Sequence, residues 1–138
     1  LITAEKFFKL KFDIIVSLPP TSPLRKKNDV LKAIKLLIKN KNDSVWTISE
    51  TESKSHPMKQ LILNKKKINF YEKKGASIIA RQQLSKVYHR NGCAYVITRE
   101  ALLNKKKLFT KNTGYLIIKS PQISIDTLDD LKLAASYI

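Results

Sequence analysis

The chain has 138 residues, which is the length of a single domain, and its formal net charge is +16. Such a charge invites a nucleic-acid role, but only four of the 27 basic residues are arginines, and readers of phosphates and bases favour the guanidinium group. We therefore interpret the excess as solvated lysine faces and disfavour a nucleic-acid partner. No apolar run reaches the length of a membrane span, and the single Cys93 excludes an internal disulfide, so a cytoplasmic protein is expected.

The first informative stretch is a buried strand that ends in a proline-rich loop. Ile14, Ile15 and Val16 follow one another without alternation, which predicts a strand covered on both faces. Prolines then stop the strand, because each removes a backbone donor and fixes φ. In open α/β sheets ligands bind beyond the carboxyl ends of strands. The loop from Pro19 to Arg25 is therefore the first place to expect a ligand.

The remaining pattern alternates between helical and strand-like segments. The expected helices are the end of one before Phe12, one from the N-cap Asn28 to Lys39, a short turn at 99–103, and one after the N-cap Thr127 with Asp130 at the capping-box position. The expected strands are 44–49, a projecting hairpin of 61–63 with 68–71, 94–97 and 115–119. This order predicts an α/β domain with a mostly parallel sheet.

Apolar spacing predicts which face each longer helix buries. In the helix after Asn28 the predicted stripe is Val30, Ile34, Leu37 and Ile38. In the last helix it is Leu128, Leu131, Ala135 and Ile138.

Three ordered motifs resemble one enzyme family. Leu18–Arg25 (LPPTSPLR) resembles the family's LQPTSPLR, 80–97 (ARQQLSKVYHRNGCAYVI) resembles RRQDLPPAYRxNGAIYI, and 124–127 (SIDT) resembles the metal-binding DIDT. On these motifs the chain resembles the carboxyl-terminal part of the acylneuraminate cytidylyltransferases, also called CMP-N-acetylneuraminic acid synthetases. The resemblance implies a Rossmann-like nucleotidyltransferase fold.

The same resemblance sets the expected domain organisation. Residues 1–138 are expected to form one partial nucleotidyltransferase domain whose amino-terminal phosphate-loop part is missing, because the three scattered glycines form no phosphate cradle. Residues 50–81 are expected to be a dimerisation insertion, with the hairpin as an arm that contacts the partner in a homodimer.

The implied reaction joins CTP and a nonulosonic (sialic-type) acid to give a CMP-sugar and pyrophosphate, with Mg²⁺ as the metal. The fragment alone is expected to be inactive. Two alternatives stay open: a non-catalytic remnant that binds sugar or dimerises, and, supported by charge alone, a basic nucleic-acid-binding module.

Asp126 is the expected catalytic and metal-binding residue, because it matches the second aspartate of the family motif. The first aspartate is Ser124 here, so one carboxylate of the implied site is lost. Without the resemblance, the favoured interpretation of Asp126 is an acidic residue that stabilises the start of the last helix.

Several residues are expected to bind the substrates. Arg81 matches the arginine that holds the sugar carboxylate, although a surface ion pair explains it equally well on physical grounds. Tyr95 is expected either to contact the acyl group or to pack in the core. The other expected substrate-binding residues are Ser22, Arg25, Lys59, Gln82 and Asn91.

Two further observations limit the site. Pro19 replaces a glutamine that contacts the sugar in the family, which predicts an altered or lost substrate preference, since proline lacks an amide's donor and acceptor. His56 and His89 lack ligand neighbours for zinc and are expected to be surface or loop histidines.

Overall fold

The computed structural model describes residues 1–138 and divides into two compact units. The first unit combines Leu1–Ser49 with Arg90–Ile138, and the second is Glu50–His89. The predicted insertion, 50–81, falls inside the second unit, which continues eight residues further. No helix of the structure is both long enough and apolar enough to cross a membrane.

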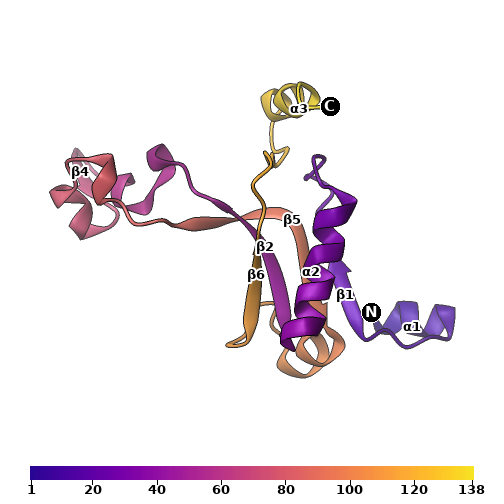
Figure 1. The fold of residues 1–138 in the computed structure, drawn as a ribbon. Helices are drawn as coiled ribbons and strands as arrows, with labels where there is room; N and C mark the ends of the chain where they lie inside the picture. The colour runs from indigo at the N-terminus through magenta and orange to yellow at the C-terminus, as the bar shows by residue number, and fades with distance from the viewer. The chain divides into compact units, whose positions relative to one another are not determined.

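The first unit is built on a four-stranded sheet in the order β1-β5-β2-β6 (Figure 1). Its elements, in chain order, are α1 (Ile2–Phe8), β1 (Ile14–Ser17), α2 (Lys27–Asn40), β2 (Ser44–Glu50), β5 (Tyr88–Thr98), the π-helical turn η5 (Ala101–Lys105), β6 (Thr113–Ile117) and α3 (Leu128–Ala135).

Strand directions make this sheet mixed, which corrects the expectation of a mostly parallel one. β5 pairs with β1 antiparallel, whereas β2 pairs with β6 in parallel. β5 also runs antiparallel to β2. The Thr98 amide donates to the Asp43 carbonyl at one end of the pair, and Asn91 contacts Ser49 at the other end. β1, β2 and β6 therefore end at the same edge of the sheet.

The core lies between α2 and one face of the sheet, where Ala33 and Leu37 pack against Val45 and Val96. Ile38 was predicted to share this face but is 59% exposed, because the buried stripe is centred one helical position earlier. The helix also begins at Lys27, with Lys26 rather than Asn28 at the N-cap.

One strand begins earlier than predicted, because polar residues extend its pairing with the neighbouring strand. β5 starts at Tyr88, six residues before the predicted strand, and its first three residues are exposed. Their backbone joins the strand although their side chains give no apolar signal. β1 occupies the edge of this four-stranded sheet, and its residues Ile14, Ile15 and Val16 are half-buried.

The last helix has its predicted cap but not its predicted buried stripe. The Asp130 amide donates to Thr127 Oγ1 over 3.2 Å, and the Thr127 amide donates to Asp130 Oδ2 over 2.8 Å. The Thr127 hydroxyl, and then the amides of Asp126 and Thr127, donate to the Asp130 carboxylate and hold its pKa below its usual value. Ala134 is the buried residue of α3, whereas Leu128 is 76% exposed.

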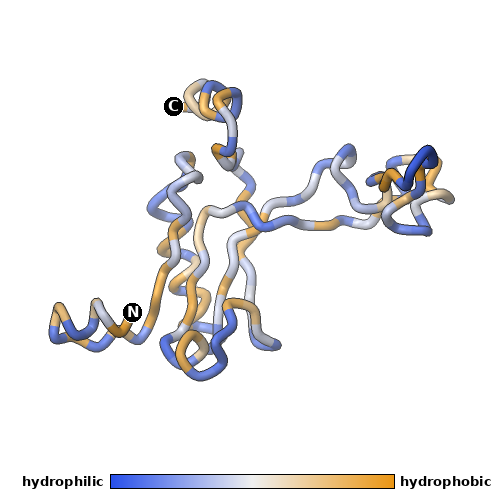
Figure 2. Tube along the Cα trace, turned by 180° about the vertical axis from the view of Figure 1, so that it is seen from behind, coloured by the Kyte–Doolittle hydropathy of each residue, from blue (hydrophilic) through white to orange (hydrophobic).

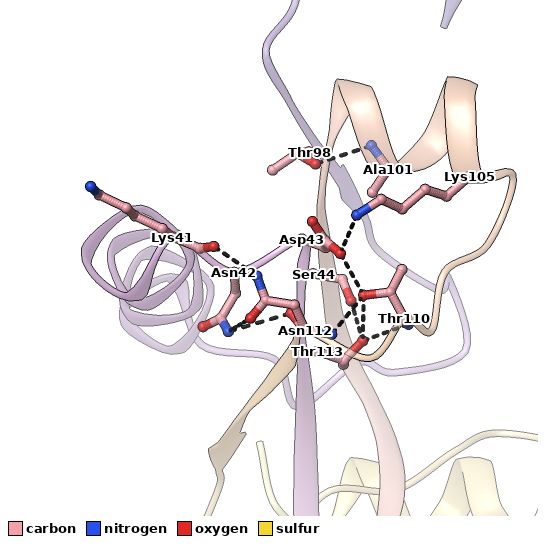
Figure 3. Close-up of polar contacts among 10 residues, drawn as sticks. All are labelled: Lys41, Asn42, Asp43, Ser44, Thr98, Ala101, Lys105, Thr110, Asn112 and Thr113. Carbon is pink, nitrogen blue, oxygen red and sulfur yellow. Dashed lines mark hydrogen bonds and ion pairs between the residues drawn. The ribbon is translucent and has the colours of Figure 1, made fainter.

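Polar contacts fasten the amino-terminal ends of β2 and β6 (Figure 3). Asp43 Oδ2 accepts from Lys105 Nζ over 2.7 Å and from Thr110 Oγ1 over 2.8 Å. These two donors hold the pKa of Asp43 below its usual value. Beside them, the hydroxyls of Ser44 and Thr113 lie 2.8 Å apart across the paired strands. These hydrogen bonds thus stabilise the amino-terminal ends of β2 and β6.

A bidentate ion pair ties α1 to the end of β5. Arg99 Nε and Nη2 donate to the two carboxylate oxygens of Glu5 over 2.9 and 3.0 Å, and the Phe12 amide donates to the same group over 3.1 Å. The Arg99 bond first, and then the Phe12 amide, lower the pKa of Glu5 from 4.5 to about 2.

Replacing Glu5 is expected to change the acid sensitivity of the fold. A carboxylate whose pKa is lowered in the folded state stabilises that state fully above its unfolded pKa of 4.5, and this stabilisation is lost as the pH falls towards about 2. Glu5→Gln should flatten the fall in urea midpoint across that window, whereas Glu100→Gln, at an exposed carboxylate, should not. Equal pH profiles for wild type and Glu5→Gln would contradict the assignment.

The second unit contains the predicted hairpin. β3 (Leu61–Asn64) and β4 (Lys67–Phe70) pair antiparallel, with Leu61 opposite Phe70, and all their residues are exposed. The unit's 3-10 turns are η1 (Ser53–Ser55), η2 (Pro57–Lys59), η3 (Lys73–Ser77) and η4 (Arg81–Gln83).

His56 has a structural role in this unit. It is 4% exposed, so it lies in a loop as predicted but not on the surface. Its Nδ1 accepts from the Met58 amide, and its Nε2 lies 3.0 Å from the Ser85 carbonyl. A neutral ring with its proton on Nε2 satisfies both contacts.

Candidate site at the carboxyl edge of the sheet

The loop after β1 is folded by its own arginine. Arg25 Nε donates to the Cys93 carbonyl over 2.6 Å, and its Nη2 donates to the Pro19 carbonyl over 2.5 Å. The Ser22 amide also donates to the Pro19 carbonyl. The guanidinium is therefore engaged in holding the loop against β5, and Arg25 positions the site in this structure.

Ser22 lies at the centre of the loop, and its hydroxyl makes no hydrogen bond. It is 3% exposed, and its Oγ has no hydrogen-bond partner. A Cβ placed on Gly92, which has a φ of +69°, would lie 2.7 Å from this oxygen. Glycine thus serves twice at this position, by adopting a left-handed backbone and by letting β5 approach the loop. A buried hydroxyl without a partner is uncommon and marks a place where a ligand group could bind.

Asn91 lies next to this contact and is 7% exposed. Its Nδ2 donates to Ser49 Oγ over 3.0 Å, and its Oδ1 accepts from the Cys93 amide over 3.1 Å. These two bonds fix the orientation of the side-chain amide and leave one donor hydrogen and one acceptor lone pair. Cys93 itself is buried, which raises the pKa of its thiol and keeps it protonated.

The segment after β6 reaches the same edge. The Ile125 amide donates to the Thr21 carbonyl over 2.9 Å, which places Asp126 beside the loop after β1. Asp126 is exposed, and its own amide donates to Asp130 Oδ2 over 3.1 Å. Gln122 adds a second buried oxygen without a partner, Oε1. No motif in the sequence singled out Gln122.

Asp126 does not belong to a cluster of metal ligands. No group of three or more histidine, cysteine, aspartate or glutamate side chains could hold an ion. The donor set therefore does not fit a cage made by the protein alone. A single exposed carboxylate does fit Mg²⁺, which binds proteins through one or two carboxylates and takes its other ligands from water and substrate phosphates.

Tyr95 packs within the first unit. Its ring lies 5.3 Å from that of Trp46 in an edge-to-face arrangement, and the side chain is half-buried. This contact agrees with the core alternative for Tyr95 and leaves part of the ring accessible.

Three predicted site residues lie in the second unit. Lys59 ends η2, and its Nζ donates to Ser53 Oγ over 2.8 Å. Arg81 and Gln82 begin η4, and both are exposed. The first unit thus brings together Ser22, Arg25, Asn91 and Asp126, whereas Lys59, Arg81 and Gln82 belong to the second unit.

Comparison with known proteins identifies the fold first. The structure of CMP:2-keto-3-deoxy-manno-octonic acid synthetase, complexed with CTP, matches 99% of this chain and 67% of its own chain with a TM-score of 0.59 and 14% sequence identity. The mixed sheet with its helix and hairpin therefore has the fold of this synthetase.

Sequence comparison then identifies relatives of the chain. The chain is 30% identical over its whole length to post-translational flagellin modification protein B of Campylobacter coli, of which it spans 58%. It is 31% identical over 116 residues to N-acylneuraminate cytidylyltransferase of Streptococcus agalactiae serotype III, of which it spans 28%. No protein-family model matches the sequence. By this homology the chain is related to flagellin modification protein B and to the N-acylneuraminate cytidylyltransferases.

Proposed function

We propose that the chain functions in a cytidylyltransferase that activates a nonulosonic acid. In the proposed reaction, CTP and the sugar acid give a CMP-sugar and pyrophosphate. The chain spans 58% of the flagellin modification protein that it resembles, so this activity is that of a whole enzyme to which the chain corresponds in part. The alternative, a non-catalytic sugar-binding or dimerising remnant, is favoured by Ser124 and Pro19, which stand where the family motifs have an aspartate and a glutamine.

The observation that carries the proposal is the meeting of two loops at the carboxyl edge of the sheet. The hydrogen bond from Ile125 to Thr21 joins the segment that holds Asp126 to the loop that holds the unpartnered Ser22 hydroxyl. Ligands of open α/β sheets bind at such an edge. In this proposal Ser22 and Asn91 offer hydrogen bonds to substrate hydroxyl groups, and Tyr95 borders the acyl group.

Arg81 is the proposed partner of the sugar carboxylate. A guanidinium presents parallel donors that match both oxygens of a carboxylate, and such bidentate bonds are about twice as strong as neutral ones. Arg81 is exposed and lies beside Gln82, so the pair offers a charge and an amide at one place. Lys59 adds a second positive charge from the same unit.

Asp126 is the residue proposed to face the metal. Mg²⁺ would be bound by this carboxylate together with the nucleotide phosphates, and it would offset the negative charge that develops on them. Ser124 holds the place of the family's other aspartate and offers only a hydroxyl.

Homodimer formation through the hairpin is part of the same proposal. Leu63 is 78% exposed and Ile68 is 65% exposed, and an isolated two-stranded sheet is only marginally stable in water. Sedimentation equilibrium measures this association directly.

The proposal is tested by saturation-transfer NMR with N-acetylneuraminic, legionaminic and pseudaminic acids. Arg81→Ala is expected to weaken binding of the preferred acid about tenfold or more, because a carboxylate loses its charge-assisted bonds. Lys86→Ala is the matched control, since it removes the same charge from an exposed pair with Glu50. Equal weakening in both variants would show a general effect of charge and contradict the role of Arg81.

A further inference from the structure

Two buried side-chain oxygens at the carboxyl edge of the sheet have no hydrogen-bond partner, Ser22 Oγ and Gln122 Oε1. A third such oxygen, Asn42 Oδ1, precedes β2 and so lies at the other end of the sheet. Proteins rarely leave a buried polar atom unpaired, because its lost hydration is then not replaced. Ser22 belongs to the proposed substrate site, and Gln122 follows β6 at the same edge. Its oxygen is therefore a candidate for contact with a ligand.

The segment that carries Gln122 begins at a contact of the site. Ser49 Oγ donates to the Ile118 carbonyl over 3.2 Å, just after β6. The same hydroxyl accepts from Asn91 Nδ2 over 3.0 Å. A single hydroxyl thus connects the proposed substrate-binding amide of Asn91 to the start of the segment.

The segment also ends at the site. The Ile125 amide donates to the Thr21 carbonyl over 2.9 Å, one residue before Ser22. The segment and the loop after β1 lie side by side in both views of the chain (Figure 1 and Figure 2). Gln122 therefore lies between two contacts that each lead to a residue of the proposed site.

The side-chain amide of Gln122 is paired at one end only. Its Nε2 donates to Ser120 Oγ over 3.3 Å, whereas its Oε1 is shielded from solvent by the chain itself and is unpaired. Exchanging the two ends of the amide would pair Oε1 with the Ser120 hydroxyl and leave the Nε2 hydrogens unpaired instead. The residue as a whole is partly exposed, and the last torsion of a glutamine side chain turns easily. The unpaired end can therefore turn towards a ligand beside it.

A hydroxyl group is the ligand group that fits these two side chains. A hydroxyl both donates and accepts, so it pairs with the amide of Gln122 in either orientation and with the hydroxyl of Ser22. A carboxylate or a phosphate only accepts, and an ammonium group only donates. A sugar acid carries several hydroxyl groups, and its carboxylate already has Arg81 as the proposed partner.

We propose that Gln122 forms a hydrogen bond with one hydroxyl group of the sugar acid, beside Ser22, and thereby determines which acids the site accepts. The inference rests on the proposed function and adds to it a specificity-determining residue. A polar group that is paired only by the right hydroxyl rejects an analogue without it, because the group then stays unpaired. Pro19, in the same loop as Ser22, has no side-chain donor or acceptor to share this task.

The first arm of the test is urea unfolding of the whole chain with Gln122→Met. Methionine is unbranched and flexible like glutamine but lacks the amide. Replacing an unpaired buried group by an apolar one of similar shape costs little, so the urea midpoint is expected to stay or to rise. Gln60→Met, at an exposed position, is the matched control and should leave the midpoint unchanged. A midpoint that falls in Gln122→Met alone would overturn the proposal, because the fold would then need the amide.

The second arm is saturation-transfer NMR with the nonulosonic acid that the wild-type chain binds best and with analogues that each lack one of its hydroxyl groups. Loss of one particular hydroxyl is expected to weaken binding to the wild type about tenfold or more. The same loss should change binding to Gln122→Met by about twofold or less, because the partner of that hydroxyl is already gone. Gln60→Met should behave as the wild type does.

Two binding results would contradict the proposal in different ways. If the acid binds and every analogue loses the same affinity in the wild type and in Gln122→Met, then Gln122 does not determine specificity. The proposed function would be unaffected by that result. If the wild-type chain binds none of the three acids, the proposed function fails and this inference fails with it.

Discussion

Thr47→Val is expected to destabilise the fold by about 2–4 kcal/mol, because it leaves two buried backbone groups without partners. Thr47 is fully buried, and its Oγ1 donates to the Ala94 carbonyl over 2.9 Å and accepts from the Ala94 amide over 2.8 Å. One side-chain hydroxyl thus bonds both backbone groups of Ala94. Valine has the same shape and removes both bonds.

Urea unfolding measures this loss, with Thr3→Val as the matched control because Thr3 is exposed in α1. The control should change the free energy of unfolding by less than about 0.5 kcal/mol. A similar small change in Thr47→Val would mean that Ala94 finds other partners. The account of how β5 joins β2 would then be wrong.

Gly92→Ala is expected to lower stability by about 1–3 kcal/mol and to disturb the candidate site. The φ of +69° is strained for alanine, and the new Cβ would lie 2.7 Å from Ser22 Oγ. The loop after β1 must then move away from β5. Substrate binding should weaken more than the loss of stability alone explains.

A double-mutant cycle with Ser22→Ala separates the two causes. Ser22→Ala alone should cost little, because its Oγ has no partner in the chain. In the double variant the contact with Gly92→Ala is relieved, and only the backbone strain should remain. Additive effects of the two substitutions would contradict the close approach between the loop and β5.

The elements with strong local signals could be predicted from the sequence. Thr127 and Asp130 were predicted as a capping box from three-residue spacing, and the structure confirms it. The hairpin was predicted from two short apolar runs around Asn64 and lysines, and it is present as β3 and β4. Such features depend on residues a few positions apart.

Features that depend on distant parts of the chain could not be predicted. The pattern of β1 indicates a central strand, but which strand lies beside it is decided by the whole topology. Nothing in the sequence of β5 indicates that this strand runs antiparallel to its neighbours. In the site, the motif around Ser22 was found by resemblance, whereas the approach of Gly92 and the buried Gln122 oxygen required coordinates.

The proposed substrate site is tested most directly by amide chemical-shift mapping with a nonulosonic acid and CTP. Our account predicts that the preferred acid shifts the amides of Ser22, Asn91 and Gly92. The lysine-rich hairpin turn at 65–67 should not respond. Shifts confined to lysine-rich segments, or no shifts at millimolar acid, would contradict a sugar-acid site at the carboxyl edge of the sheet.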